Sequence, residues 1–163
     1  MRRSARELVK NSKSRYLPEE LRRRPIARDS LGRPLCRWCD GVVSPPRRSF
    51  CSAACVDEWT IRSSGLCLRA SVYQRDQGVC AHCGLDTSDL QAYLRQIEDS
   101  TKRAELLTAH GLSESRIRSS LWEADHILPV SEGGGCCGLE GLRTLCWKCH
   151  QAETSALMRR RSR

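Results

Sequence analysis

LWEADHILPV, at residues 121–130, and LRTLCWKCH, at residues 142–150, are the most informative stretches of this 163-residue chain. The first has a strand-like pattern. The second predicts a short strand at 142–145, followed by a helix that starts near Trp147 and runs into the C-terminal tail. A loop with three consecutive glycines, 133–135, lies between them. We therefore expect a strand–loop–strand–helix unit.

This unit collects residue types that suit phosphodiester hydrolysis. Asp125 and His126 end the first strand, and His150 stands near the start of the helix. A carboxylate and an imidazole can hold a divalent metal, and a further imidazole can take a proton from water at neutral pH. Taken singly, His126 is more often a structural histidine, Asp125 a turn or cap residue, and His150 a spare zinc ligand. The joint pattern favours a catalytic site.

Eight of the eleven cysteines form two sets with the spacing of zinc ligands. Two residues between paired cysteines place both sulfurs suitably for one tetrahedral ion. Two structural Zn²⁺ ions would stabilise a chain whose 5% aromatic content predicts a thin core. The alternative is a reduced thiol pair or a redox Cys-x-x-Cys, but the strand–helix alternation of redox folds is missing. The predicted ligands are Cys36, Cys39, Cys51 and Cys55 for one ion, and Cys80, Cys83, Cys146 and Cys149 for the other.

The cysteine count and the hydropathy of the chain indicate its cellular compartment. An odd cysteine count argues against a complete disulfide framework, and no stretch resembles a signal peptide or a membrane span. We therefore expect an intracellular, reducing location, in the cytoplasm, nucleoid or nucleus, without a membrane partner. Cys67 is expected to be a small buried apolar residue, whereas Cys136 and Cys137 have no assigned role.

The formal net charge of +9 is concentrated in the two tails. Residues 1–28 hold ten Arg or Lys and three Glu, and residues 159–163 hold four Arg. Basic tails on a near-neutral body suit a nucleic-acid backbone, while a solvated terminus or a localisation signal is the alternative. The predicted phosphate contacts are Arg22, Arg23, Arg24, Arg159, Arg160 and Arg161.

The pattern along the chain predicts three parts. They are a basic arm at 1–28, an N-terminal zinc-binding knuckle and helix at 29–65, and a catalytic domain at 66–163. Residues 86–120 contain no cysteine and have helical periodicity, so we expect a helical insertion there.

These motifs resemble a known family. Asp-His-Ile-x-Pro-Val from Asp125, the glycine loop, and Leu-x-x-Leu-x-Thr-Leu-Cys-x-x-Cys-His up to His150 look like the HNH, or ββα-metal, endonuclease motif. Over residues 30–158 the chain is also similar to the C-terminal HNH module of annealing helicases that carry a zinc finger and a RAN-binding domain. The resemblance implies a small, zinc-stabilised α+β fold. Its ββα-metal core would sit on a treble-clef frame, with an N-terminal zinc knuckle and a helical insertion.

The resemblance also implies roles. Asp125 and His150 would hold one catalytic divalent metal, Mg²⁺ or Mn²⁺, and His126 would be the general base. The substrate would be DNA, double-stranded or branched, and a separate helicase or other protein is an expected partner. The family's middle Asn is replaced here by Gly141. Because that Asn braces the loop, we expect slow cleavage that Gly141→Asn would raise, unless Glu140 substitutes for it.

Two other functions stay open at this point. The chain can be a zinc-stabilised DNA-binding module in which the change to Gly141 has weakened or removed cleavage. It can also be an interaction scaffold that does not touch nucleic acid.

Overall fold

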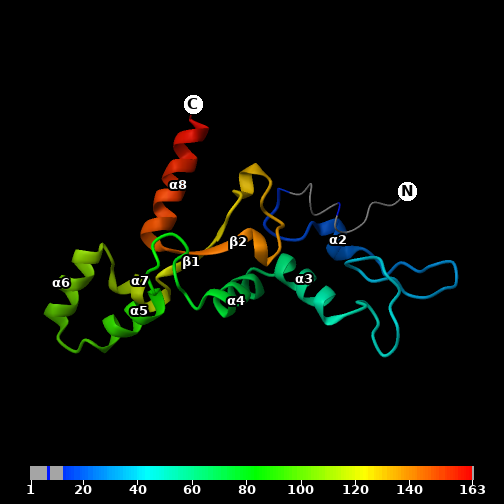
Figure 1. Cartoon of the computed structure of the whole chain (residues 1–163), viewed down its shortest axis with the longest axis horizontal. Coiled ribbons are helices and arrows are strands. Elements are labelled where there is room, and N and C mark those ends of the chain that lie inside the picture. The colour runs from blue at the N-terminus through cyan, green and yellow to red at the C-terminus, as the bar shows by residue number, and fades with distance from the viewer. Residues whose placement is uncertain (1–6, 8–12, 163) are drawn as a thin grey trace. The chain divides into compact units, whose positions relative to one another are not determined.

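The computed structural model describes Glu7 and residues 13–162, and Figure 1 labels its helices and strands. The rest of the predicted basic arm, at 1–6 and 8–12, lies outside the described residues. Contacts divide the chain into two compact units. Unit 1 is Met1–Ser71 with His126–Leu142, and unit 2 is Val72–Asp125 with Arg143–Arg163. No described helix is both long and apolar enough to cross a bilayer.

Unit 1 surrounds the first cysteine set. It contains α2 (Glu19–Arg23) and α3 (Ala53–Ser63), and α4 (Gly65–Asp76) begins in it. The Ser52 hydroxyl accepts a hydrogen bond from the Cys55 amide (3.2 Å) and so fixes the start of α3. Two leucines of the predicted arm, Leu17 and Leu21, are buried here. The core of unit 1 consists of Leu17, Leu21, Cys36, Trp38, Val43, Cys55 and Cys136.

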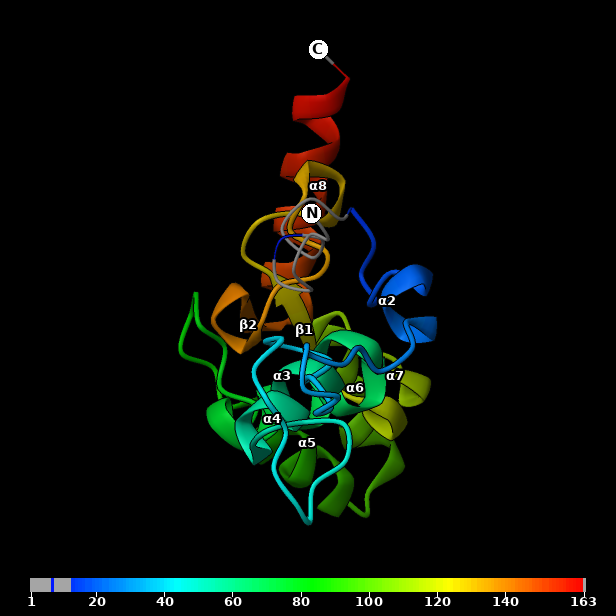
Figure 2. The ribbon, with the colours of Figure 1, turned by 90° about the vertical axis from the view of Figure 1, so that its right-hand side faces the viewer.

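Unit 2 contains the helical insertion, which is confirmed as α5 (Thr87–Gln96), α6 (Ser100–His110) and α7 (Glu114–Ser119). The three helices gather in one place in Figures 1 and 2. Asp86, Asp99 and Ser113 cap them by accepting bonds from backbone amides in the first turn. Their inward faces meet around Leu94, Leu107, Ile117 and Leu121.

The predicted strand–loop–strand–helix unit is also confirmed. β1 (Trp122–His126) pairs with β2 (Leu142–Cys146) in a two-stranded sheet, and α8 (Trp147–Arg161) follows directly. The loop between the strands carries two short 3₁₀ turns, η1 (Val130–Glu132) and η2 (Leu139–Gly141). In unit 1, the Ile127 amide donates to the Gly141 carbonyl (2.9 Å) and closes this loop at its base.

Buried Thr144 ties β2 to the rest of unit 2. Its hydroxyl donates to Asp76 Oδ2 (2.8 Å), and its carbonyl accepts from the Ala81 amide (2.8 Å). The hydrogen-bonded ion pair with Arg75 lowers the pKa of Asp76, and the bond from Thr144 lowers it further. Partial burial of the carboxyl raises the pKa, but by less. The two bonds of Thr144 therefore hold β2 beside the Cys80–Cys83 turn.

Candidate functional site

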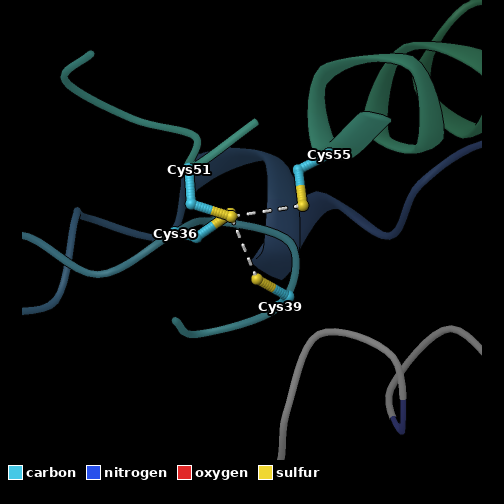
Figure 3. Close-up of side chains that lie close together, drawn as sticks. All are labelled: Cys36, Cys39, Cys51 and Cys55. Atoms are coloured by element: carbon cyan, nitrogen blue, oxygen red, sulfur yellow. Dashed lines mark hydrogen bonds between the residues drawn. The ribbon is translucent and has the colours of Figure 1, made fainter. Parts of the chain in front are cut away.

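The first cysteine set lies in unit 1 and forms a compact group of four thiols. All four sulfurs lie within 4.8 Å of one another, and Figure 3 shows the side chains converging. Cys51 Sγ is 3.4 Å from Cys39 Sγ and 3.5 Å from Cys55 Sγ. Burial raises the pKa of the Cys36 thiol, but hydrogen bonds from the amides of Cys39, Cys51 and Trp38 bring it down to about 7. This thiol is therefore ready to lose its proton to a metal.

The second set has the same character in unit 2. Cys80 and Cys83 come from one tight turn, Cys146 ends β2, and Cys149 lies in the first turn of α8. Cys83 Sγ is 3.7 Å from Cys146 Sγ. Burial raises the pKa of Cys80, and backbone amide bonds, first among them that of Cys146, offset this and lower it to about 6. Both sets fit a structural zinc ion, with four thiolates in tetrahedral reach.

Asp125 lies in a charged network of unit 2. Arg143 Nε donates to Asp125 Oδ2 (2.9 Å), and Arg143 Nη2 lies 3.4 Å from Glu153 Oε2. Arg143 Nη1 is also 2.8 Å from His82 Nε2. A guanidinium only donates, so His82 Nε2 must accept, and the ring proton sits on Nδ1, which faces Glu153 Oε1 at 3.8 Å. Asp125 is therefore already paired with the Arg143 guanidinium.

His150 lies in the first turns of α8, with Glu153 one turn further along the same side of the helix. Within the described residues, the groups of three or more potential ligands that gather within 4.8 Å are the two cysteine sets. Asp125 and His150 belong to neither. Sequence reasoning missed Arg143, although an arginine in the middle of the apolar strand LRTLC was the available signal.

His126, in unit 1, has a defined hydrogen bond through its imidazole. Nε2 lies 3.2 Å from the carbonyl oxygen of Gly135. The carbonyl can only accept, so in the neutral ring Nε2 carries the proton and Nδ1 carries the lone pair. A backbone carbonyl that fixes the tautomer and the ring orientation in this way is the arrangement a general base needs.

The loop around Gly141 has no room for a side chain. A Cβ at this position would lie 2.5 Å from Cys137 Cβ and 2.8 Å from Cys137 Sγ. The expectation that Gly141→Asn would simply brace the loop is therefore wrong, because Cys137 fills the space. Burial raises the pKa of Cys137, with nearby Glu140 adding to it, so this residue is a protonated packing group. Glu140 Oε1 itself lies 3.9 Å from Arg62 Nη2, on α3.

Comparison with known proteins agrees with the motifs. Residues 112–156, which include Asp125, His126, Cys146 and His150, match the HNH endonuclease family model. Through this segment the chain belongs to the HNH endonuclease family. The HNH chain is 35% identical over 153 residues to the DNA annealing helicase and endonuclease ZRANB3 of Mus musculus. It is 36% and 34% identical, each over 154 residues, to the proteins of that name from Bos taurus and Homo sapiens.

The extent of these matches is uneven. They cover 82% of the HNH chain, which spans only about 14% of the length of these relatives. The crystal structure of the human ZRANB3 HNH domain is also similar, at 35% identity and a TM-score of 0.49. That match covers 60% of the HNH chain and 92% of the solved domain.

Zinc content is the first measurable consequence. We expect about two zinc ions per purified chain, because each thiol set can hold one. Cys36→Ser should remove one ion and leave unit 2 folded, whereas Cys149→Ser should remove the other and disturb the neighbouring His150. Elemental analysis and far-ultraviolet circular dichroism measure both effects. Cys67→Ser, outside both sets, is the control and should keep two ions; one ion or none in the parent would contradict the assignment.

Gly141→Asn gives a second prediction. The Cβ clash with Cys137 should lower the free energy of unfolding by about 1–3 kcal/mol, the usual cost of overpacking. Adding Cys137→Gly removes both atoms that the new Cβ would meet, so the double variant should recover much of the loss. Urea unfolding of the parent, both single variants and the double variant measures this coupling. A single Asn variant as stable as the parent would disprove the packing argument.

Proposed function

We propose that this HNH chain is a divalent-metal-dependent endonuclease that hydrolyses DNA phosphodiester bonds, with His126 as the general base. The observation that carries the proposal is the bond between His126 Nε2 and the Gly135 carbonyl, within the family's own motif. It leaves Nδ1 as the basic nitrogen, which takes the proton from the attacking water. The name of the relatives, DNA annealing helicase and endonuclease, supports DNA as the substrate.

Asp125 and His150 are the proposed ligands of the catalytic metal. The donor set fits, because a carboxylate with an imidazole suits Mg²⁺ or Mn²⁺. When bound, the ion supplies positive charge for the phosphate and the leaving oxygen. Arg143 holds the Asp125 carboxylate in place. Its guanidinium would have to share this carboxylate with a bound ion or move away from it.

The exposed arginines are the proposed phosphate contacts. Arg22 and Arg23 on α2 and Arg159, Arg160 and Arg161 at the end of α8 are exposed to solvent. Arg24 is different, since its guanidinium is mostly covered and lies 3.4 Å from Asp40 Oδ1. Phosphate binding therefore falls mainly to the exposed set, with little sequence preference.

A zinc-stabilised DNA-binding module with weak or lost cleavage is the second candidate. Gly141 favours it, because this position has no side chain that could make the hydrogen bonds of the family Asn. The two functions separate cleanly in vitro. A parent protein that shifts DNA in EDTA but nicks no plasmid with Mg²⁺ or Mn²⁺ is the module and not the enzyme.

His126 and Asp125 give the decisive pair of variants. His126→Ala should lower single-turnover plasmid nicking by about 100-fold or more, because general bases contribute that much, while DNA affinity and zinc content stay near the parent values. Asp125→Ala should also lose nicking and, in addition, bind Mn²⁺ more weakly by electron paramagnetic resonance. His110→Ala, a histidine on α6, is the matched control. If His126→Ala nicks at the parental rate, another residue is the base.

The phosphate contacts are best tested by charge removal. Deleting 1–28 would also remove Leu17 and Leu21 from the core of unit 1, so Arg22→Gln with Arg23→Gln is the cleaner change. The slope of log K against log salt should flatten by about 0.9 for each phosphate that is no longer neutralised. Fluorescence anisotropy between low and moderate salt measures the slope, with Arg33→Gln as the control outside both tails. An unchanged slope in the double variant would exclude these two arginines.

A further inference from the structure

We propose that the segment at residues 13–17 is a structural part of the site around His126, and that Cys136 is the positioning residue that fastens it there. The inference rests on the proposed role of His126 as the base. All of the residues concerned lie in unit 1.

Gly135 contacts both the base and the segment. Its carbonyl accepts the His126 Nε2 bond at 3.2 Å. On its other side, a Cβ would lie 2.2 Å from the Ser14 carbonyl oxygen and 2.8 Å from that of Lys13. The N-terminal segment therefore lies directly against the backbone that orients the imidazole, and only glycine permits that approach.

Cys136 links the next residue of the loop to the same segment. Its Sγ is 2.8 Å from the Ser14 carbonyl oxygen and 2.9 Å from the Tyr16 carbonyl oxygen. The side chain is buried in the core of unit 1 and belongs to neither zinc set. The Cys136 thiol has one proton and can donate to one of these two carbonyls at a time. The Ser14 and Tyr16 carbonyls therefore share this donor, which holds the segment at 13–17 in place.

The segment is anchored on its other side as well. The Leu17 amide donates to the Arg62 carbonyl on α3, and the Leu17 side chain shares the core with Leu21 and Cys136. The Tyr16 hydroxyl packs so closely on Gly65 that a Cβ there would be 2.8 Å away. The segment thus connects the glycine loop to the helical part of unit 1.

This arrangement gives the glycine loop a rigidity that its own backbone cannot supply. Three consecutive glycines leave the loop free to move, and a base displaced by a fraction of an ångström loses rate steeply. Cys136, with the carbonyls of Ser14 and Tyr16, holds the part of the loop next to Gly135, in addition to the Ile127–Gly141 bond at the base of the loop. The N-terminal segment therefore does more than attach a basic arm, because it positions His126 through Gly135.

Cys136→Ala removes the donor and tests the proposal. Single-turnover nicking should fall about tenfold or more with unchanged DNA affinity and two zinc ions retained. Cys136→Ser keeps a donor and should recover most of the rate, and Cys67→Ala is the matched control for loss of a thiol. The ¹⁵N shifts of the His126 ring should show one Nε2–H tautomer in the parent and a mixture in Cys136→Ala. An Ala variant with parental rate and parental ring shifts would overturn the proposal.

Two further readouts keep the outcome clear. If the parent does not nick DNA, the proposed function fails, but the ring shifts of parent and variants still decide the positioning role. If Cys136→Ala does not fold, the nuclear Overhauser contacts of the unmodified parent decide instead. Contacts between Gly135 and residue 14 or 15 are expected, and their absence would overturn the proposal.

Discussion

Four sulfurs, from Cys80, Cys83, Cys146 and Cys149, converge within 4.8 Å of one another and organise unit 2. Their convergence joins positions more than 60 residues apart and so closes the insertion of three helices at its base. The same set fixes the end of β2 and the first turn of α8. His150 follows the last of these cysteines directly, so the cysteines also fix the position of this histidine on α8. A chain with few aromatic residues obtains its order from such links rather than from a large core.

The charged groups of unit 2 hold the Asp125 carboxylate in a network around Arg143. Asp125 and Glu153 both face Arg143, and His82 accepts from the same guanidinium. Charge-assisted bonds of this kind are among the strong ones in proteins, so they hold the carboxylate in one orientation. The same bonds oppose any competing cation. If Asp125 is the metal ligand that we propose, a metal ion has to compete with Arg143 for its carboxylate.

The elements with strong local signals could be predicted from the sequence. The Cys-x-x-Cys spacing predicted both thiol sets, and the motif at 121–150 predicted the strands and α8, because each of these signals lies in a short stretch of sequence. Leu17 and Leu21 show the limit, since an arm rich in arginine gave no sign that these leucines enter a core. The Arg143 network joins residues from a turn, two strands and a helix, and only the folded chain brings them together.

Cys137 and Gly141 show why one missing family residue is a poor guide to what a site lacks. Considered alone, Gly141 is an absent side chain and a loss of bracing. In the structure its Cβ position is taken by Cys137, while its carbonyl still accepts from the Ile127 amide at 2.9 Å. The loop is thus held by the packing of Cys137 and by a backbone bond that any residue type could make. Only a glycine at 141 leaves room for the Cys137 side chain. The two positions have to be considered as one pair, because restoring Asn at one of them without changing the other places two side chains in a space that holds one.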